Sequence, residues 1–497
     1  MMNIKSIDLK LMILSNKGPI YFSIFLFLTA FGCNKIDIPD PYGALPSERQ
    51  MAWHQMDYYA FIHFNINTFS NLEWGHGNED PSIFNPTELD CNQWAKVCKE
   101  AGMEGIIITA KHHDGFCLWQ SKYTEHSVKN SPWRDGKGDL LRELSEACKA
   151  YDLKLGVYLS PWDRNNPLYG TDEYNDYFVK QLTEVLTSYE DIFEVWFDGA
   201  NGEGPKGKKQ VYDWEKFIAT VRKHQPNAVI FSDAGPDIRW IGNEKGFAKQ
   251  TNWHTLNKNN YYPGTPNYHE LTEGNKNGTH WLPAEVNVST RPGWYYHEDQ
   301  DDKVKSVDQL EKMYYQSVGR SCNFLLNIPV DRRGLIHENE IKVLKGLNER
   351  LENTFSNPVP IKIPVSLAYT TSYFNIGEPT KYLLDNDLNT FWSTQENASK
   401  AVFEIQIKKE NKANVIEIAE YIPLGQRVEA FEIEGLLNGR WVNLYQGTTI
   451  GWKRLIKLPK EDIKRFKLSI VKSMATPIIS NLKMYYAPHE NELLEME

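Results

Sequence analysis

The sequence predicts an α/β protein, a (β/α)8-like TIM-type barrel followed by an all-β sandwich. From about residue 57, short continuous apolar runs alternate with amphipathic stretches of helical period, which is typical of a parallel sheet covered on both faces. Polar or aromatic residues recur directly after the apolar runs, as they do at the carboxyl ends of barrel strands. After about residue 353 the helical period largely disappears, and short alternating runs indicate antiparallel strands.

The barrel is expected over residues 46–354. Its strands are predicted in "YYAFIHFNI", "GIIITAKHHDGF", "KLGVYLSPWD", "FEVWFDG", "AVIFSDAG", "WLPAEVNVS" and "NFLLNIPVD". Helices are predicted in "NQWAKVCKEAG", "LLRELSEACKAY", "DYFVKQLTEVLTSY", "WEKFIATVRKHQP" and "LEKMYYQSVGRS". So many units favour a closed barrel over an open doubly wound sheet. No GxGxxG follows an early strand, which weakens a dinucleotide-binding alternative.

The sandwich is expected over residues 362–487. Three prolines in "NTFSNPVPIKIPVS" mark a linker between the two regions. The runs "AVFEIQI", "NVIEIAEYI", "AFEIEGLL" and "RFKLSIV" then alternate apolar and polar residues, as the strands of an antiparallel sandwich do.

The N-terminus has the pattern of an export signal over residues 1–33. Lys5, Lys10 and Lys17 precede the apolar run "PIYFSIFLFLTAFGC", which is too short to cross a bilayer comfortably. Cys33 resembles the acylated cysteine of a bacterial lipoprotein. We therefore expect an exported, periplasmic or outer-membrane-associated lipoprotein of a bacterium, with membrane contact only through this anchor. An ordinary secretory signal and a membrane-anchoring helix are the alternatives.

Composition narrows the classes of partner. A net charge of -10 argues against nucleic acid, for which a basic patch is expected. The aromatic content of 13% favours carbohydrate slightly, because aromatic faces stack on sugar rings as well as fill cores. Beyond Cys33, five cysteines show no CxxC pair and no metal-ligand spacing, so we expect buried thiols, with a disulfide as the alternative. They are Cys91, Cys98, Cys117, Cys148 and Cys322.

Candidate site residues follow the predicted strands. They are His63, His112, His113, Trp162, Asp163, Asp198, Asp233 and Glu285. Asp198 ends the apolar run in "FEVWFDGANGEG", where an acid can attack an anomeric carbon if a second carboxyl group protonates the leaving oxygen. A turn residue before Gly199 is the alternative.

The stretch "AKHHDGF" suits sugar binding better than metal binding. Adjacent histidines are expected on opposite sides of an extended chain, so His112 and His113 do not suit one metal ion. Further ligands at suitable spacing do not stand out, which argues against a metal site in this stretch. Imidazoles that hydrogen-bond sugar hydroxyls fit the pattern, while Asp114 can serve as a structural cap.

Two later stretches complete the candidate pocket. "DIRWIGNEKG" offers Glu244 in a polar loop, and "WLPAEVNVSTRPGWYYH" offers Glu285, Arg291, Trp294 and His297. Arg291 beside carboxylates can instead form a structural ion pair. "EWGHG" offers Trp74 as a stacking surface. Together these residues indicate a pocket for a neutral, polar, ring-shaped substrate.

In this order, the motifs from about residue 50 to 350 resemble the α-L-fucosidases of glycoside hydrolase family 29. They are "FIHFNINTF", "EWGHG", "AKHHDGFCLW", "LGVYLSPWD", "EVWFDGANG", "RWIGNE" and "PAEVNVSTRPGWYY". The resemblance implies a retaining exo-hydrolase on a (β/α)8-like barrel that uses no metal or organic cofactor. "EWG" and "RWIGNE" look like the branch that prefers α-1,3/1,4-linked fucose on oligosaccharides or glycoconjugates.

The resemblance also implies roles for single residues. Asp198 falls on the family's nucleophile, and Glu244 would be the acid/base, with Glu285 as second choice. The positions that match those holding the fucose hydroxyls and ring are His63, Trp74, His112, His113 and Tyr158. Trp294 would add apolar surface. In "HFNINTF" Asn65 stands where the family often has glycine, which puts the detailed role of His63 in question.

The last 120 or so residues resemble a discoidin-type module, with "YLLDNDLNTFWST" as the recognisable stretch. Sugar binding and a structural brace against the barrel are both open for it. For the whole chain, the rival hypotheses are a non-catalytic fucose-binding protein, another retaining glycosidase, and a metal-dependent hydrolase using "HHD". The two candidate carboxylates argue against the first, and the ordered motifs argue against the other two.

Overall fold

The computed structural model describes residues 38–266, 268–364, 379–394 and 398–489. The predicted signal with Cys33 lies outside the described residues, so export and lipid anchoring stay predictions, as do the proposed domain boundaries. Within the described ranges, no helix is both long and apolar enough to cross a membrane. The five cysteines of these ranges are buried, and none of them forms a disulfide.

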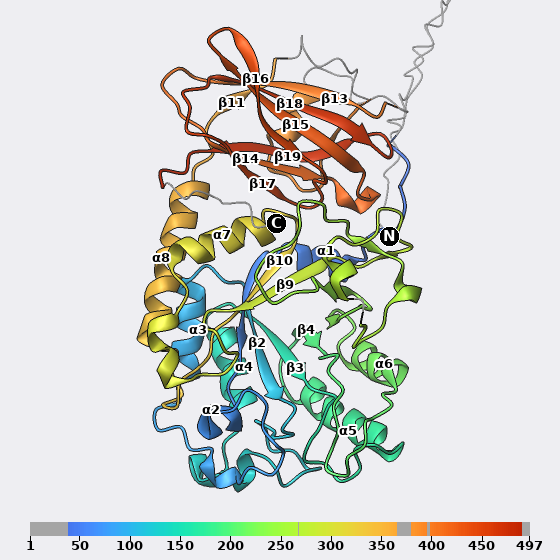
Figure 1. Ribbon diagram of the computed structural model, residues 1–497, viewed down its shortest axis with the longest axis vertical. Coiled ribbons are helices and arrows are strands. Elements are labelled where there is room, and N and C mark those ends of the chain that lie inside the picture. The colour runs from blue at the N-terminus through green and yellow to red at the C-terminus, as the bar shows by residue number, and fades with distance from the viewer. Residues whose placement is uncertain (1–37, 267, 365–378, 395–397, 490–497) are drawn as a thin grey trace, which may run out of the picture. The chain divides into compact units, whose positions relative to one another are not determined.

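Eight parallel strands close into a barrel in the order β1-β10-β9-β6-β5-β4-β3-β2. Figure 1 labels β2, β3, β4, β9 and β10 of this barrel. The predicted fold class is therefore confirmed. The strands are β1 (Tyr58–Ile62), β2 (Gly105–Lys111), β3 (Lys154–Leu159), β4 (Ile192–Trp196), β5 (Val229–Ser232), β6 (Ile238–Trp240), β9 (Ala284–Ser289) and β10 (Asn323–Asn327). Every residue of β1, β2, β9 and β10 is buried, as expected where helices cover one face of a parallel sheet and the barrel interior fills the other.

Helices surround the barrel. They are α1 (Glu48–His54), α2 (Ile66–Ser70), α3 (Cys91–Glu100), α4 (Leu140–Ala150), α5 (Glu173–Ser188), α6 (Trp214–His224), α7 (Val307–Ser317) and α8 (Glu338–Phe355). Helix α4 shows why these segments fold as predicted. The Asp139 side chain caps its first turn by accepting from the Arg142 amide at 3.1 Å, and Leu140, Leu144 and Cys148 form one buried face.

The region around β6 departs from the regular repeat. Residues 233–237 join β5 to β6 without a helix, and β6 falls in "DIRWIGNEKG", where the sequence analysis expected only a polar loop. Before β9 the chain adds a long excursion that carries the two-stranded sheet of β7 (Thr255–Leu256) and β8 (His280–Trp281).

The C-terminal region forms two antiparallel sheets, coloured orange to red in Figure 1. One contains β11 (Ile361–Lys362), β13 (Ala401–Ile407), β18 (Arg465–Ser473), β15 (Val428–Leu437) and β16 (Arg440–Gly447); the other contains β12 (Trp392–Ser393), β19 (Ile478–Tyr485), β14 (Val415–Glu420) and β17 (Arg454–Lys457). Side chains from both sheets, such as Phe403, Phe431, Ile418 and Leu482, share one apolar core. The predicted β-sandwich is therefore confirmed as a fold.

The long excursion before β9 is hydrogen-bonded to the sandwich. The buried Arg454 guanidinium donates to the Gln250 carbonyl oxygen at 2.9 Å and to the Tyr445 hydroxyl at 2.8 Å. The His254 amide donates to Gln426 Oε1 at 2.8 Å. These bonds connect the sandwich to the same chain segment that follows the end of β6.

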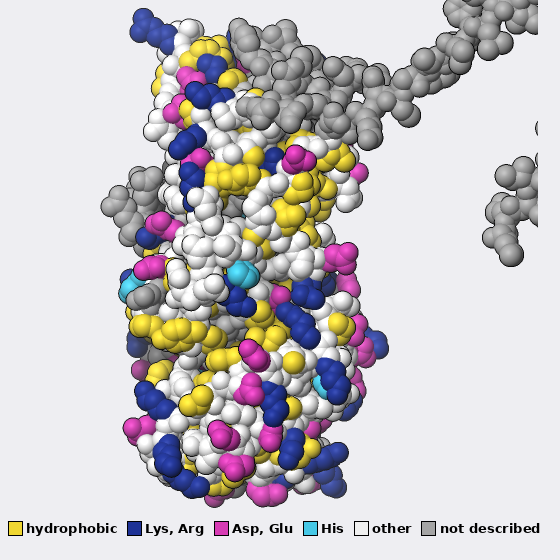
Figure 2. Space-filling model, turned by 90° about the vertical axis from the view of Figure 1, so that its right-hand side faces the viewer, with side chains coloured by type: hydrophobic (Ala, Val, Ile, Leu, Met, Phe, Trp, Pro, Cys, Tyr) yellow, Lys and Arg dark blue, Asp and Glu magenta, His cyan; other side chains and the backbone are white. Residues whose placement is uncertain are grey.

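Acidic and basic side chains are interspersed on the face of the molecule shown in Figure 2, with apolar and uncharged side chains between them. This face presents a surface of mixed charge, consistent with a chain in which 55 basic residues are distributed among 65 acidic ones.

Replacing Arg454→Ala should lower the free energy of unfolding by about 2 kcal/mol, because it removes the charge-assisted hydrogen bonds to the Gln250 carbonyl and the Tyr445 hydroxyl. Urea denaturation followed by tryptophan fluorescence measures the change. Arg440→Ala, at an exposed position of β16, is the matched control and should have little effect. Equal effects of the two replacements would contradict the bracing role of Arg454.

Candidate active site

Asp198 lies just beyond β4, at the carboxyl-end rim of the barrel. Its Oδ2 accepts a hydrogen bond from the Tyr158 hydroxyl at 3.0 Å, and its Oδ1 accepts from the Ala200 amide at 2.8 Å. The side chain is 26% exposed. Asp198 is thus held in one orientation by both oxygens while remaining open to a bound molecule, as an attacking group requires.

Gly199 is required by the same geometry. A Cβ atom built at Gly199 would lie 2.3 Å from Asp233 Oδ2 and 2.5 Å from the Gly264 amide nitrogen. Any other residue would push the chain away from Asp233 and displace the neighbouring Asp198. Gly199 therefore sets the position of Asp198. The Asp198–Gly199 pair does more than form a turn, which was the alternative interpretation of this sequence.

His112 and His113 lie on the same side, which corrects the sequence expectation. Their ring centroids are 4.1 Å apart, because the chain turns immediately after β2 instead of continuing as a strand. His113 Nδ1 is 2.8 Å from Ser160 Oγ, and His113 Nε2 is 3.8 Å from Asp198 Oδ2. Within the described ranges, no group of three or more His, Cys, Asp or Glu side chains is arranged to hold a metal ion.

Burial keeps the three site histidines neutral. It lowers the pKa of His63 to about 3 and that of His113 to about 4, where the Asp198 charge offsets part of the burial effect. The pKa of His112 is also held well below its ordinary value, first by burial and then by His113 and His63. His112 Nδ1 is buried without a hydrogen-bond partner within the described residues. Neutral imidazoles can both donate to and accept from hydroxyl groups.

His63 joins the histidine pair from β1. Its Nδ1 lies 2.8 Å from Asn327 Oδ1, and its ring is 5.2 Å from Trp294 and 5.7 Å from His112. Tyr158 stacks on His112 at 5.5 Å, which completes an aromatic cluster at the rim.

Asn65 has a clear structural role in place of the glycine. Its Oδ1 caps α2 by accepting from the Asn67 amide at 2.7 Å, and its Nδ2 donates to Asp114 Oδ2 at 2.9 Å. Its φ of -161° is ordinary extended backbone, so no glycine is needed there. Asp114 is fully buried and accepts from the Phe116 amide at 2.7 Å, which makes it the structural cap that the sequence left open.

Glu244 lines the same cavity of about 520 Å³ as Asp198. Trp294 Nε1 is 3.4 Å from Glu244 Oε2. The Glu244 side chain as a whole is exposed to solvent, but the surrounding protein partly desolvates its carboxyl group. This desolvation raises the pKa of Glu244, and the charges of Asp198 and Glu73 raise it further against the Trp294 hydrogen bond.

Two further carboxyl groups lie near this cavity, and the sequence predicted no role for either of them. Asp233, one of the strand-end acids, lines the cavity, and burial raises its pKa to about 7 although it accepts from the Gly264 amide at 2.6 Å. Glu73 precedes Trp74 in "EWGHG"; it accepts from the Trp294 amide at 2.8 Å and pairs with His297 Nε2 at 2.6 Å. The motif was the available signal for Glu73, but its partners lie more than 200 positions away.

Trp74 presents an exposed indole at the rim. It is 56% exposed, and its ring meets those of His113 and Trp162 edge-on at 5.7 Å each. A large aromatic face that is open to solvent beside the histidine pair is available for stacking on a sugar.

Glu285 does not reach this cavity, which corrects its assignment as a substrate contact and second-choice acid/base. Its side chain is completely buried inside the barrel. Tyr59 Oη lies 2.5 Å from its Oε2, and Trp196 Nε1 donates to its Oε1 at 2.9 Å. A carboxyl group enclosed in this way cannot contact a leaving group.

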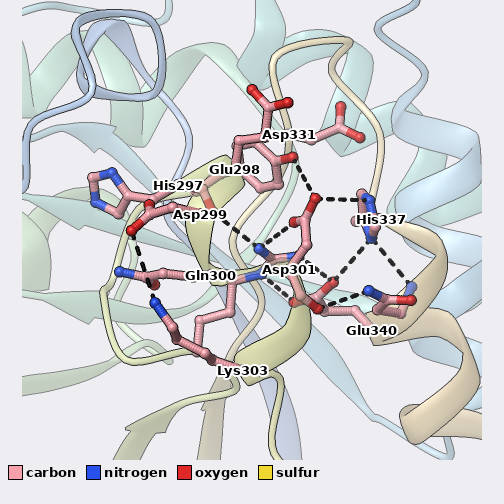
Figure 3. A network of polar contacts seen from close by, with 12 residues as sticks. His297, Glu298, Asp299, Gln300, Asp301, Lys303, Asp331, His337 and Glu340 are labelled. Carbon is pink, nitrogen blue, oxygen red and sulfur yellow. Dashed lines mark hydrogen bonds and ion pairs between the residues drawn. The ribbon is translucent and has the colours of Figure 1, made fainter.

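Arg291 forms a structural ion pair, which is the alternative that the sequence left open. This corrects the expectation that Arg291 contacts the substrate. Its guanidinium is buried and bonds both oxygens of Glu340, at 2.5 and 2.9 Å, and Asp301 Oδ1 at 2.6 Å. Figure 3 shows Asp301, His337 and Glu340 brought together at this network from the loop before α7 and the start of α8. The ion pairs therefore fix the loop after β9 to α8.

A closed parallel barrel with two carboxyl groups facing one rim cavity, beside neutral histidines and open aromatic faces, defines the class of barrel glycosidases. The family model described as Alpha-L-fucosidase matches residues 42–354. Alpha-L-fucosidase 1 of Arabidopsis thaliana is 43% identical over 451 residues, which covers 90% of this chain and 88% of that protein. The chain therefore belongs to the α-L-fucosidase family and is a glycoside hydrolase.

Solved structures agree with this membership. A glycoside hydrolase 29 family member from an unknown rumen bacterium shares 40% identity at a TM-score of 0.79, covering 91% of this chain and 79% of that one. A family 29 fucosidase of Ruminococcus gnavus, solved in complex with fucose, shares 29% identity at a TM-score of 0.82, covering 93% and 98%.

Replacing Tyr158→Phe should lower kcat/KM for an aryl α-L-fucoside by about 10- to 100-fold, because Asp198 Oδ2 loses a hydrogen bond worth about 1.5–3 kcal/mol. Steady-state release of the aryl group measures the change. Tyr189→Phe removes a hydroxyl that bonds Asp139 at the start of α4 and is the control. Unchanged kinetics in Tyr158→Phe would show that this bond does not position Asp198.

Proposed function

We propose that the chain is a retaining exo-α-L-fucosidase that removes terminal α-1,3/1,4-linked fucose from oligosaccharides or glycoconjugates. The observation that carries the proposal is the single cavity lined by both Asp198 and Glu244. One carboxylate is fixed by hydrogen bonds for attack, and the pKa of the other is raised, as a proton donor requires. A non-catalytic binding protein would need neither arrangement.

In this mechanism Asp198 attacks the anomeric carbon while Glu244 protonates the departing glycosidic oxygen. The C–O bond to the leaving group breaks, and a covalent fucosyl-enzyme forms on Asp198. Glu244, now a carboxylate, takes a proton from water, and the hydroxyl oxygen displaces Asp198 from the anomeric carbon. Two successive displacements at the anomeric carbon return its original configuration. This mechanism requires the two carboxyl groups to lie about 5–5.5 Å apart when the sugar is bound.

The histidine cluster would hold fucose by its hydroxyl groups. His63, His112 and His113 are neutral and so offer both donors and acceptors, and the unpartnered His112 Nδ1 needs a partner. Trp74 and Trp294 supply apolar faces for the methyl-bearing side of the sugar or for the neighbouring residue. A site built to hydrogen-bond specific hydroxyls rejects sugars that lack them.

The cavity extends beyond the two carboxyl groups, which supports a saccharide as the leaving group. Its far wall includes the exposed Tyr262 and Tyr268, and Tyr268 lies 5.4 Å from the Trp240 ring. Aromatic faces of this kind stack on sugar rings. Together with the likeness of "EWG" and "RWIGNE" to the α-1,3/1,4-preferring branch, they favour a branched glycan substrate.

The sandwich is proposed to be a discoidin-like module that braces the barrel. The support is the likeness of "YLLDNDLNTFWST" and two hydrogen bonds with the excursion before β9, one donated by Arg454 and one accepted by Gln426. The Arg454→Ala comparison described above tests the bracing role.

The function is tested by hydrolysis of an aryl α-L-fucoside and a Lewis-type trisaccharide by wild type and by Asp198→Ala, with and without a chelator. We expect fucose release from both substrates, unchanged by chelation and lost in the variant, with retained configuration in the first product by NMR. Azide should restore turnover of the aryl substrate in Asp198→Ala and give the inverted fucosyl azide. Turnover unaffected by the loss of Asp198 would refute the mechanism, and release only from the aryl substrate would refute the linkage proposal.

We expect the loss of activity at high pH to reflect the deprotonation of Glu244. The acid must be protonated, so kcat/KM should fall as pH rises through the raised pKa of Glu244. Glu244→Gln should lower kcat/KM for the trisaccharide by about 100-fold or more and remove this alkaline limb.

Two control variants separate Glu244 from the neighbouring acids in this pH profile. Asp233→Asn tests the other acid of the cavity, whose pKa is raised to about 7, and Glu285→Gln tests the buried carboxyl. An alkaline limb that survives in Glu244→Gln but disappears in Asp233→Asn would assign the proton donor to Asp233 instead.

A further inference from the structure

Two carboxyl groups lie completely buried in the barrel interior, below the rim. Glu194 comes from β4 and Glu285 from β9, and neither has any exposed surface. Both contact the Tyr59 hydroxyl: Glu285 Oε2 lies 2.5 Å from it, and Glu194 Oε2 lies 3.2 Å from it. Through this shared hydroxyl the two carboxyl groups are close enough to influence each other's protonation. The proposed reaction uses neither group.

The surroundings hold no positive charge that could balance this pair. Among the described residues, no Lys, Arg or His side chain forms an ion pair with either carboxyl group. The polar groups facing them are the Tyr59 hydroxyl from β1, the Trp53 indole N–H from α1, and the Trp196 indole N–H from β4. Tyr59 is the only titratable group among these three, and burial with the two nearby carboxyls raises its pKa well above the ordinary value, so it stays protonated.

Hydrogen-bond counting then favours an additional proton, because the Trp53 N–H lies closer to Tyr59 Oη, at 2.8 Å, than to Glu194 Oε2, at 3.2 Å. Tyr59 has one hydroxyl hydrogen, so it cannot donate to both carboxyl groups at once. Two carboxylates that share one hydroxyl group, with no cation nearby, would also repel strongly at low dielectric. A proton on one carboxyl removes the repulsion and supplies a donor between the pair.

The donors distinguish the two groups. Each oxygen of Glu285 has a close donor, Trp196 Nε1 at 2.9 Å and the Tyr59 hydroxyl at 2.5 Å. Glu194 has only longer contacts at 3.2 Å, all to Oε2, and its Oε1 is buried without a partner. Close donors stabilise a carboxylate, whereas an oxygen without a donor does not suit a charge.

We propose that Glu194 carries a proton in the folded protein and donates it to an ionised Glu285, and that this acid pair is a positioning device for Asp198. In agreement, burial and then the Glu285 charge raise the pKa of Glu194 well above its ordinary range. Burial raises that of Glu285 only to about 7, because its donors oppose the shift.

The pair reaches Asp198 through two aromatic rings. Glu285 holds the Trp196 indole, which lines the rim cavity and stacks on Tyr158 with centroids 5.2 Å apart and planes at 26°. Tyr158 in turn donates to Asp198. A change in the hydrogen bonds at Glu285 therefore displaces Trp196 and the donor that orients Asp198.

Glutamine substitution distinguishes the role of Glu194 from that of Glu285, because glutamine is a neutral isostere with one acceptor and one donor group. Glu194→Gln replaces the proposed COOH by an amide that can still donate to Glu285, so kcat/KM for an aryl α-L-fucoside should stay within about threefold of wild type. Glu285→Gln leaves only one acceptor for two donors, so kcat/KM should fall about tenfold or more. Exposed Glu146→Gln is the control.

A second readout follows from the pH dependence of stability. Glu194 has a folded pKa above its unfolded value, so the stability it contributes is present at low pH and lost as pH rises from the ordinary glutamate range towards the folded pKa. Glutamine cannot ionise in either state. The Tm of Glu194→Gln relative to wild type should therefore rise as the pH increases from about 5 towards the folded pKa of Glu194, while that of Glu146→Gln should not.

The stability readout does not depend on Asp198 being the nucleophile, so it separates failure of this proposal from failure of the proposed function. Equal kinetic effects of the two glutamine variants, or a Tm difference independent of pH for Glu194→Gln, would overturn the proposal. If Glu194→Gln does not fold, Glu194→Leu tests whether a neutral side chain is accepted. Failure of both neutral variants to fold would also overturn it.

Discussion

Parallel closure of eight strands is the constraint on which the rest of the structure depends. Since all the strands run in the same direction, every residue that follows a strand is delivered to one rim. His63, His112, Asp198 and Asp233 come from four different strands and are widely separated in the sequence, yet they meet there. The loop after β6 adds Glu244 from the same side.

Desolvation gives these rim residues their chemical states. The same burial that makes the three histidines neutral raises the pKa values of Glu244 and Asp233. Asp198 is oriented by donors to both of its oxygens. In the proposed reaction, one enclosed rim holds a carboxylate for attack and a second carboxyl group that retains its proton, which is the division of labour that glycoside cleavage needs.

Beneath and around the rim, buried polar groups hold the loops in place. Arg291 joins the loop after β9 to α8 through Glu340, and Arg454 joins the excursion before β9 to the sandwich. Glu285 and Glu194 connect the opposite walls of the barrel through Tyr59. Removing one partner from such a buried set leaves an uncompensated polar group, so each set favours a single arrangement of the loops.

The sequence by itself determined the alternation of strands and helices, the change to an antiparallel sandwich, and the position of Asp198 at a strand end. These follow from apolar period and local turn chemistry, which depend on near neighbours. It missed β6, which has only three residues in a polar stretch. It also separated His112 from His113, because a strand period was assumed where the chain turns.

Only the tertiary structure decided which candidate carboxyl faces the cavity. In the sequence, Glu285 follows an apolar run and Glu244 lies in a polar loop, and both positions suit a catalytic acid. In the structure, Glu285 points into the barrel towards Tyr59, 226 positions earlier in the chain. Arg291 finds its partner Glu340 on α8, 49 positions later. Exposure and pairing of this kind depend on contacts between segments far apart in the sequence, and local pattern carries no information about them.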